Sequence, residues 1–298
     1  MQTGIPFPDW LSPMVFPEGF FFGYTLPLRW YALAYIVGIV IGWRISHMAM
    51  KRPALWRAQT PPMTTARLEE LLTWIVIGVI AGGRLGYVIL YRPAYYASNL
   101  IEVPQIWDGG MSFHGGFLGV VLAIFIFARR HAIPLGSAAD TVALAAPPAI
   151  LLGRLANFVN AELWGRPTDL PWGVIFPGQA AQACATATTL CARHPSQLYE
   201  AAIEGLFLLI LLVWMAFRGG ALRRPWLISG TFFVVYGLGR FLVELVRQPD
   251  AQFVSPGNPL GLAVQIDGYG LTMGQLLSLP MILVGIAVIL WAWRRPVA

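Results

Sequence analysis

Long apolar runs separated by short polar loops dominate the chain. Seven of these runs approach the ~20 residues that an α-helix needs to cross the ~30 Å hydrocarbon core of a bilayer. The predicted helices are Leu28–Ser46, Leu68–Tyr91, Phe113–Arg130, Ser137–Phe158, Ser196–Phe217, Pro225–Val246 and Leu271–Trp293. The pattern predicts an all-α polytopic membrane protein with seven transmembrane helices, in one integral membrane domain over residues 1–298.

Proline and glycine modify several of these helices. Pro147 and Pro148 interrupt the fourth helix and free backbone groups that protein or water must satisfy, so we expect a kink or break there. Glycines four residues apart on the first three helices predict close helix–helix contacts of a kind common in membranes. They are Gly38 and Gly42, then Gly78, Gly82 and Gly86, then Gly115 and Gly119.

The composition agrees with a membrane protein. Charged residues make up 11% of the chain, whereas soluble domains contain about 25%. The net charge of +6 does not indicate nucleic-acid binding, because the chain has one Lys and its Arg residues lie mostly in short loops between apolar runs. The first 25 residues contain no basic segment and are interrupted by four prolines, so we expect no cleavable signal peptide.

Basic residues mark every second loop. These loops hold 11 of the 20 Lys and Arg residues, namely Lys51, Arg52, Arg57, Arg67, Arg129, Arg130, Arg218, Arg223, Arg224, Arg294 and Arg295. Positive charge marks the cytoplasmic side, so the pattern predicts an external, periplasmic N-terminus and a cytoplasmic C-terminus. The long connection 160–195 between the fourth and fifth helices is then periplasmic, and long ordered loops on one face often carry function.

The fourth predicted helix ends in a polar stretch that is unusual for a membrane span. Arg154, Asn157, Asn160 and Glu162 lie within nine residues. A charge in hydrocarbon costs several kcal/mol unless it is paired or hydrated, so this cluster indicates a binding or catalytic site. The alternative is a helix end whose Arg reaches the headgroups, but that does not account for the amides and the carboxylate.

The sixth predicted helix carries a second polar group. Tyr236, Arg240 and Glu244 are spaced four residues apart and share one face, and Arg247 extends the patch outwards. Arg240 and Glu244 could simply neutralise each other. However, Arg240 lies near the outer end of its helix, as Arg154 does, which suggests a shared anion, and the guanidinium fork suits phosphate.

Two further intramembrane residues have alternative interpretations. His114, which is followed by Gly115 at the start of the third helix, could accept a proton near neutral pH or only form an interfacial hydrogen bond. Arg84 is expected to be structural, paired with a carboxylate such as Asp140 or Glu162, although it could instead face a cavity.

The outer connection and the helix that follows it leave two questions open. In the segment His194–Glu200, Pro195 suits a first helical turn and Glu200 complements the positive helix end, so the segment is either a helix cap or part of a site. Cys184 and Cys191 could form a disulfide or remain free thiols. No Cys and His spacing fits zinc and no phosphate-binding Gly loop is present, so we expect neither metal nor cofactor.

Together these patterns predict a cavity at the outer leaflet in which arginines bind an anion. The natural anion at that depth is a phospholipid headgroup, which indicates a protein that handles membrane lipid. A lipid or anion transporter is the rival, and it should show polar residues that continue to the cytoplasmic side. Asp140 is the main inner polar residue. A structural scaffold would not need intramembrane arginines.

The chain resembles the prolipoprotein diacylglyceryl transferases of bacterial inner membranes. Their signature, Gly-Arg-x-x-Asn-Phe-x-Asn-x-Glu-x-x-Gly, is met at every fixed position of residues 153–165, with Ala156 where Gly is usual. Further segments that resemble the family are 29–31, 114–116, 194–200, 236–250 and 271–275, so the similarity extends from Arg29 to the last helix.

The resemblance implies transfer of the diacylglyceryl group of phosphatidylglycerol to the lipobox cysteine thiol in the signal peptide of a prolipoprotein, at the bacterial inner membrane. It implies a thioether product and glycerol phosphate as the leaving group, without metal or cofactor. We expect His114 to act as base and Arg154 and Arg240 to stabilise the phosphate. The remaining site residues expected to orient or bind the substrates are Tyr31, Gly115, Asn157, Asn160, Glu162, Gly165, Tyr236, Glu244 and Arg247.

Overall fold

The computed structural model describes residues 4–16, 28–184, 190–266 and 269–295. Part of the N-terminal stretch, for which no cleavable signal peptide is expected, lies outside these residues. Short parts of two later connections, 185–189 and 267–268, also lie outside them. Within the described residues, six helical segments are long and apolar enough to cross a membrane: α1 (Trp30–Met50), α2 (Thr65–Leu90), α4 (Phe113–Arg130), Leu135–Val159, Ser196–Phe217 and α11 (Met273–Arg294). The prediction of an all-helical polytopic membrane protein is therefore confirmed.

The sixth predicted helix is shorter than the sequence suggested. It is α10 (Leu227–Val243), an apolar helix of 17 residues, where the prediction ran from Pro225 to Val246. The fourth is divided into α5 (Leu135–Ala145) and α6 (Pro147–Val159), which meet at Ala146 as the proline pair indicated. The fifth consists of α8 (Ser196–Glu200), the π-helical η5 (Ala201–Phe207) and α9 (Leu208–Phe217).

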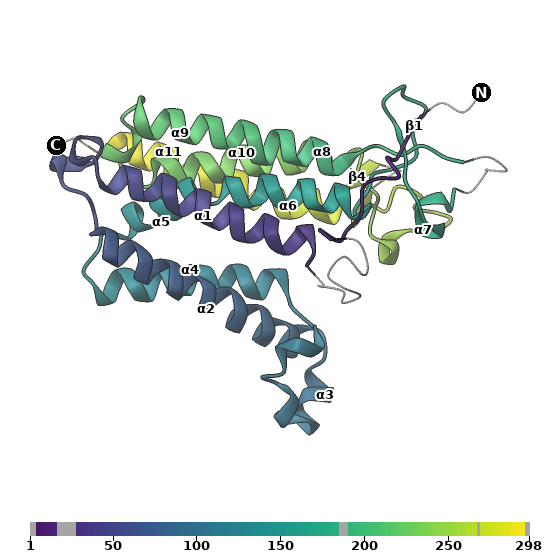
Figure 1. Cartoon of the computed structure of the whole chain (residues 1–298), viewed down its shortest axis with the longest axis horizontal. Helices are drawn as coiled ribbons and strands as arrows, with labels where there is room; N and C mark the ends of the chain where they lie inside the picture. The colour runs from purple at the N-terminus through teal and green to yellow at the C-terminus, as the bar shows by residue number, and fades with distance from the viewer. Residues whose placement is uncertain (1–3, 17–27, 185–189, 267–268, 296–298) are drawn as a thin grey trace.

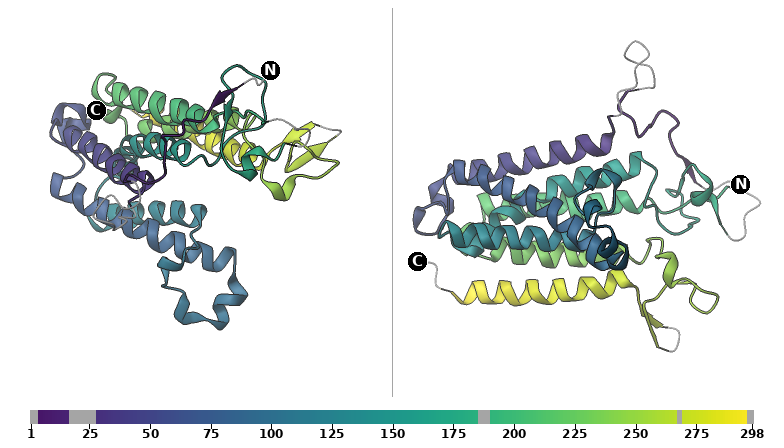
Figure 2. Two further views of the ribbon diagram at one scale, coloured as in Figure 1. Left: turned by 45° about the vertical axis from the view of Figure 1, so that its right-hand side comes forward. Right: turned by 90° about the horizontal axis from the view of Figure 1, so that it is seen from below.

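The helices form one bundle with a side pair. α1, α6, α8–α10 and α11 run alongside one another, and α2 and α4 lie together on one side (Figure 1). Seen from below, α1 and α11 lie at opposite edges of the bundle (Figure 2). The side pair is tightly packed because a methyl group added at Gly78 would lie 2.6 Å from the carbonyl oxygen of Gly119, and one at Gly86 would lie 2.6 Å from the Cα of Gly115.

The shorter elements lie between the long helices and at their ends. We call the end of the bundle opposite the C-terminus the outer end. There β1 (Ile5–Pro6) pairs in parallel with β2 (Val174–Ile175), and β3 (Val264–Ile266) pairs antiparallel with β4 (Tyr269–Leu271). The short helices are α3 (Pro93–Ser98) and α7 (Gln179–Gln182). The 3₁₀ turns are η1 (Pro53–Leu55), η2 (Arg57–Gln59), η3 (Leu100–Glu102), η4 (Ile106–Asp108), η6 (Ala221–Arg223) and η7 (Ala251–Phe253).

Two apolar cores stabilise opposite ends of the molecule. The larger lies among α1, α2, α4, α5, α9 and α10 and includes the fully buried Phe127, Leu144 and Leu208. The smaller contains Val174 and Phe176 and lies at the outer end, against the end of α6. The site described below includes α6, whose end packs on this second core.

Asp140 fixes the start of α10 at the other end of the bundle. Its carboxylate accepts hydrogen bonds from the backbone N–H of Trp226 (2.7 Å) and of Ser229 (2.8 Å), and from the Ser229 hydroxyl. These are the unpaired donors of a helix N-terminus, where a negative charge is favourable. Asp140, the main polar residue of the inner half, therefore links α5 to the N-terminus of α10.

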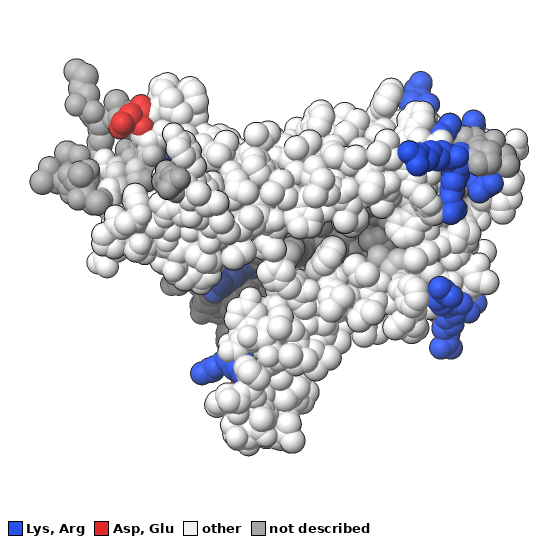
Figure 3. All heavy atoms as spheres, turned by 180° about the vertical axis from the view of Figure 1, so that it is seen from behind, with Lys and Arg blue, Asp and Glu red and all other residues white. Residues whose placement is uncertain are grey.

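Basic side chains gather at the end of the bundle that carries the C-terminus. Figure 3 shows Lys and Arg concentrated there, with a broad uncharged band across the helices. Arg57, Arg223, Arg224 and Arg295 line one small cleft at this end. Arg223 also donates to the backbone oxygen of Ala54 at 3.1 Å, which joins two of the basic loops.

Candidate functional site

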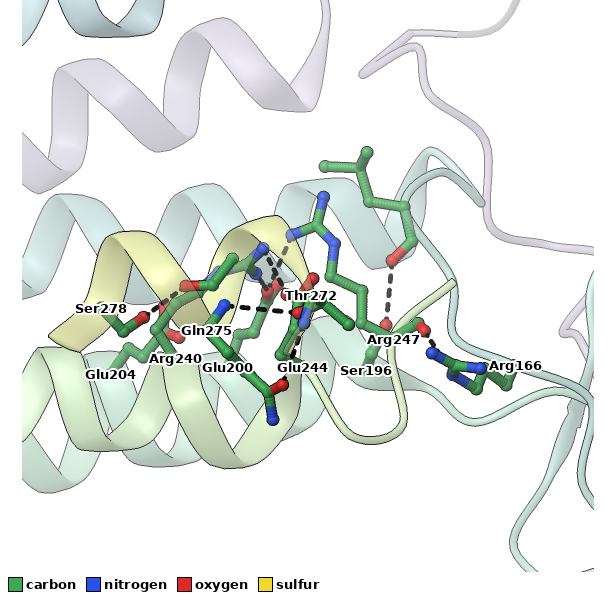
Figure 4. Close-up of polar contacts among 12 residues, drawn as sticks. Arg166, Ser196, Glu200, Glu204, Arg240, Glu244, Arg247, Thr272, Gln275 and Ser278 are labelled. Carbon is green, nitrogen blue, oxygen red and sulfur yellow. Dashed lines mark hydrogen bonds and ion pairs between the residues drawn. The ribbon is translucent and has the colours of Figure 1, made fainter. Parts of the chain in front are cut away.

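One buried carboxylate, that of Glu200, holds three arginines from different parts of the chain. Its oxygens lie 3.2 Å from Arg154 of α6, 2.8 Å from Arg240 of α10 and 3.2 Å from Arg247, just beyond α10. Glu200 is 1% exposed. Figure 4 shows Arg240 and Arg247 converging on it. We call Arg154, Arg240 and Arg247 the arginine cluster. Arg154 and Arg240 lie together, as their similar depth suggested, and the anion that they share in the structure is the Glu200 carboxylate, which Arg247 also contacts.

Two other carboxylates complete the cluster. Glu244 lies 2.6 Å from Arg240, four residues away on the same helix, and Glu204 lies 3.7 Å from Arg154. The Glu244 carboxylate also approaches the first turn of α11, where a methyl group added at Gly274 would lie 2.5 Å from it. Glycine there lets the carboxylate reach the positive helix end. Glu204 is fully buried, and its contact with Arg154 is the longest in the cluster.

The arginine cluster retains the capacity to bind an anion. About one fifth of each of its side chains is exposed, at 20% for Arg154, 19% for Arg240 and 20% for Arg247. A guanidinium has five N–H donors, and the ion pairs with carboxylates engage only some of them. Taking the buried Glu200 away from its arginines would leave charges uncompensated, which is costly. Glu200 therefore holds the three arginines from their buried side, and the exposed part of each guanidinium is accessible to an anion.

The signature stretch forms a polar loop beside the cluster. The side-chain amides of Asn157 and Asn160 donate to Oε1 of Glu162, at 2.8 Å and 3.2 Å. The Gln197 amide in turn donates to the backbone oxygen of Glu162 at 2.6 Å. Glu162 is exposed and contacts these amides, and no described contact joins its carboxylate to an arginine. The two asparagines thus set the position of Glu162, and the loop is bonded directly to the start of α8.

Gly165 is the last residue of the signature, and the structure leaves no room for a side chain at this position. A methyl group at this position would lie 2.5 Å from the carbonyl oxygen of Val246 and 2.7 Å from the Cβ of His194. Its backbone N–H donates to the backbone oxygen of His194 at 2.8 Å, and it bridges to Arg247. Burial lowers the pKa of His194 below its ordinary value of 6.5. Gly165 therefore holds the connections after α10 and before α8 together.

Of the predicted residues outside the signature, Tyr236 contacts the cluster, and no described contact joins Tyr31 or His114 to it. Tyr236 is on α10 and interacts with Arg154 through its hydroxyl. The Tyr31 hydroxyl lies 3.0 Å from that of Tyr35, one turn along α1. His114 is exposed at the start of α4, and among the described residues no contact joins it to an arginine of the cluster. The following Gly115 packs against α2.

Arg84 is structural, but the predicted carboxylate partner is wrong. It is 4% exposed and donates to the backbone oxygens of Glu102 and Val103, both at 2.7 Å, and of Gly109 at 2.6 Å. Its guanidinium also lies 5.1 Å from the centre of the Tyr96 ring. Arg84 therefore binds the carbonyl groups of the loop between α2 and α4, whose unpaired oxygens need donors.

The two cysteines in the outer connection form a disulfide, which settles the alternative that the sequence left open. The chain that follows Cys191 leads to Arg193, which is 3% exposed and lies 4.1 Å over the Trp164 ring. Arg193 also donates to the backbone oxygen of Gly165 at 3.2 Å. This part of the connection thereby supports the signature from outside.

The comparisons with known proteins agree with the geometry. The family model of prolipoprotein diacylglyceryl transferase matches residues 18–291. The chain belongs to the prolipoprotein diacylglyceryl transferase family. It is 62% identical over 296 residues to a phosphatidylglycerol–prolipoprotein diacylglyceryl transferase of Ruegeria pomeroyi, covering 99% of this chain and all of the relative. Proteins of the same name from Roseobacter denitrificans (61% identical) and Cereibacter sphaeroides (57%) each cover 97% of this chain and 98% of their own length.

In this member of the transferase family, the structure decides the role of a residue that the sequence leaves open. The segment His194–Glu200 could be a helix cap or part of a site, and the Glu200 carboxylate binds the arginine cluster. Glu204, which pairs with Arg154, is not singled out by the sequence analysis. Both are carboxylates inside an apolar run, four residues apart, and an ionisable residue within a span indicates a buried partner. That signal was present in the sequence. No three His, Cys, Asp or Glu side chains among the described residues are grouped to hold a metal ion.

The Glu200→Gln substitution tests whether Glu200 contributes more than Glu204 to the stability of the folded protein. Breaking a buried ion pair from one side costs about 3–5 kcal/mol, and Glu200 serves three arginines. We expect this variant to unfold in detergent at a clearly lower temperature than the parent protein. Glu204→Gln is the matched control, because Glu204 has one long contact with one arginine. Equal loss of stability in both variants would contradict the central role of Glu200.

Proposed function

We propose that this chain transfers the diacylglyceryl group of phosphatidylglycerol to a cysteine thiol of a prolipoprotein. Family membership supports the reaction class, because the relatives named above carry this donor and acceptor in their names. The observation that carries the proposal for this chain is the arginine cluster at the outer helix ends, held by one buried carboxylate and partly exposed.

The reaction forms one S–C bond and breaks one C–O bond. The cysteine sulfur attacks the glycerol carbon that bears the phosphate ester, and glycerol phosphate leaves with the bonding electrons. The thiol proton passes to a base, because the thiolate is the nucleophile. Negative charge therefore grows on the sulfur first and on the phosphate afterwards.

Arg154 and Arg240 stabilise the leaving phosphate in this proposal. Both come from the outer turns of their helices, and Glu200 orients both. Donors that are already positioned where charge develops are an effective means of lowering a barrier. Glu204 holds Nη2 of Arg154 only at 3.7 Å, so we assign this nitrogen to the phosphate while Nη1 stays paired with Glu200.

The signature loop and the tyrosines orient the substrates. Asn157, Asn160 and Glu162 form one bonded unit beside the cluster, and we assign it to the glycerol hydroxyls of the headgroup. Tyr31 and Tyr236 approach from α1 and α10. Arg247 and Glu244 keep the cluster in place, while Gly165 and Gly115 allow the backbone to approach closely.

His114 is the proposed base. It is exposed at the start of α4, where a substrate thiol can reach it. A free thiol has a pKa near 8.5 and is mostly protonated at neutral pH, which makes a positioned base useful.

A transporter is less well supported than a transferase. A path for an anion needs polar groups that continue to the inner side. Asp140 was the main inner candidate, and its carboxylate is occupied by the N-terminus of α10.

We further propose that α10 is a seventh span, that the N-terminus is periplasmic and that the protein lies in the bacterial inner membrane. The basic end seen in Figure 3 would face the cytoplasm by the positive-inside rule. Lys51, the single lysine, is exposed there and provides a test. In intact cells a membrane-impermeant amine reagent should leave Lys51 unmodified, and in inverted vesicles it should react. Modification in intact cells would reverse the orientation.

A transfer assay tests the proposed reaction. Purified protein, phosphatidylglycerol and a peptide with a lipobox cysteine should give a peptide whose mass has increased by one diacylglyceryl group. Arg154→Lys should lower kcat/KM about 10- to 100-fold, because Lys lacks the guanidinium fork. Arg129→Lys, at the opposite end of the bundle, is the control and should be unchanged. Near-normal turnover of Arg154→Lys would refute the phosphate assignment.

The role of His114 has its own test in the same assay. Loss of a general base typically lowers a rate by about 10²–10⁴-fold. His114→Asn should therefore be slow at pH 7 and should recover as the pH rises toward the pKa of the thiol. His131→Asn, at the other end of α4, is the control. If His114→Asn kept both the rate and the pH profile, another group would be the base.

A further inference from the structure

A small cleft lies at the end of the bundle that carries the C-terminus, and we call it the basic cleft. Four of the six described residues that line it are arginines, and the other two are uncharged. The arginines are Arg57 in η2, Arg223 and Arg224 at the end of η6 and just after it, and Arg295 just after α11. The connection between α1 and α2, the connection between α9 and α10, and the end of α11 therefore meet around one strongly positive space.

The chain supplies no counter-charge to the basic cleft among the residues that the structure describes. Their ion pairs lie elsewhere, between Glu70 and its partners Arg67 and His131, and within the arginine cluster. Like charges that line one cleft repel one another, and an anion placed among them attracts each of them. Glu200 is that anion for the arginine cluster. At the basic cleft an anion from outside the chain can take the same role.

Two of the four arginines are held in place by backbone oxygens. Arg223 donates to the backbone oxygen of Ala54 from Nε at 3.3 Å and from Nη2 at 3.1 Å. Arg224 donates from Nη1 to the backbone oxygen of Trp293 at 3.3 Å. A guanidinium has five N–H donors, so each of these side chains keeps donors for a ligand. Because the side chains are already ordered, binding costs less conformational entropy than it would for free side chains.

Two exposed tryptophans near the end of α11 indicate that the basic cleft lies at the membrane surface. Trp291 and Trp293 are exposed, and tryptophan is enriched where a membrane meets water. The guanidinium of Arg295 lies 3.6 Å from the centre of the Trp291 ring. That of Arg224 lies 4.6 Å from the centre of the Trp293 ring. The anions abundant at this depth are the phosphate groups of lipid headgroups, whose oxygens match the guanidinium fork.

The size of the basic cleft agrees with a phosphate group. Its volume is about 20 Å³, far below the roughly 300–1,000 Å³ of small-ligand pockets. It therefore suits a compact charged group that enters from the surface, and not a whole organic molecule. Basic pockets between membrane spans are typical binding places of anionic headgroups on the cytoplasmic side.

We propose that the basic cleft binds the phosphate group of an anionic phospholipid in the leaflet at this end of the bundle. This lipid is not the donor, because the arginine cluster lies at the opposite end, and the inference does not rest on the proposed function. The bound phosphate joins the two connections to the end of α11. Since α11 lies at an edge of the bundle (Figure 2), the lipid stabilises the position of this helix.

Removing two of the positive charges tests this inference. The double variant Arg57→Gln/Arg295→Gln changes two exposed side chains that form no described hydrogen bond within the protein, so we expect it to fold. The probe is phosphatidic acid, an anionic phospholipid without the glycerol headgroup of the proposed donor. In native mass spectrometry from detergent, one binding site should be weakened at least tenfold relative to the parent protein.

The matched control is the double variant Arg129→Gln/Arg130→Gln, which removes the same charge at the end of α4 and should bind phosphatidic acid as the parent does. Equal weakening in both double variants would overturn the inference, because it would show only attraction to a positive surface. Equally tight binding of zwitterionic phosphatidylcholine at the affected site would also overturn it. Arg295→Gln alone provides the same comparison with a smaller change.

The unfolding temperature in detergent is a second readout and distinguishes lipid from soluble phosphate. Phosphatidic acid should raise it in the parent protein and in the control, and less in the variant of the basic cleft. Inorganic phosphate at the same concentration should have little effect. If inorganic phosphate raised the unfolding temperature as much as the lipid did, the lipid assignment would be wrong. Neither readout requires transfer of a diacylglyceryl group, so failure of the proposed function would leave this test intact.

Discussion

The site depends on one ionic interaction, the sharing of the Glu200 carboxylate by three arginines. Arg154, Arg240 and Arg247 repel one another, and without a common counter-charge they would not converge in a membrane protein. Glu200 is itself positioned by the start of α8, where Ser196 donates to the backbone oxygen of Leu163 at 3.0 Å. The charged cluster and the signature loop therefore fix each other, and neither is formed by a single segment.

The helix ends explain why this arrangement faces one side. The outer turns of α6, α8 and α10 supply the charged groups, and the first turn of α11 receives Glu244 beside Gly274. The inner half is filled by the larger apolar core, and Asp140 is committed to capping α10. The buried ion pairs of the arginine cluster thus lie at one end of the bundle, where α6, α8 and α10 meet.

Hydropathy and the signature predicted most of the fold and part of the site. α2, α4 and α11 lie close to their predicted bounds because a membrane span is a local property of sequence. The partners of the buried charged side chains were harder to predict from the sequence. Arg84 was expected to pair with a carboxylate, but its acceptors are backbone oxygens, which leave no mark in a sequence. Glu200 satisfied the rules for a helix cap equally well, and only the packing of α6 and α10 around it revealed its arginine partners.

A structure of the protein with phosphatidylglycerol bound, at a resolution that locates the phosphate, tests the central claim most directly. The account predicts phosphate oxygens within about 3 Å of guanidinium nitrogens of Arg154 and Arg240, with Glu200 still paired to both side chains on the inner side. A headgroup bound elsewhere, or bound while both guanidiniums stay fully occupied by carboxylates, would contradict it.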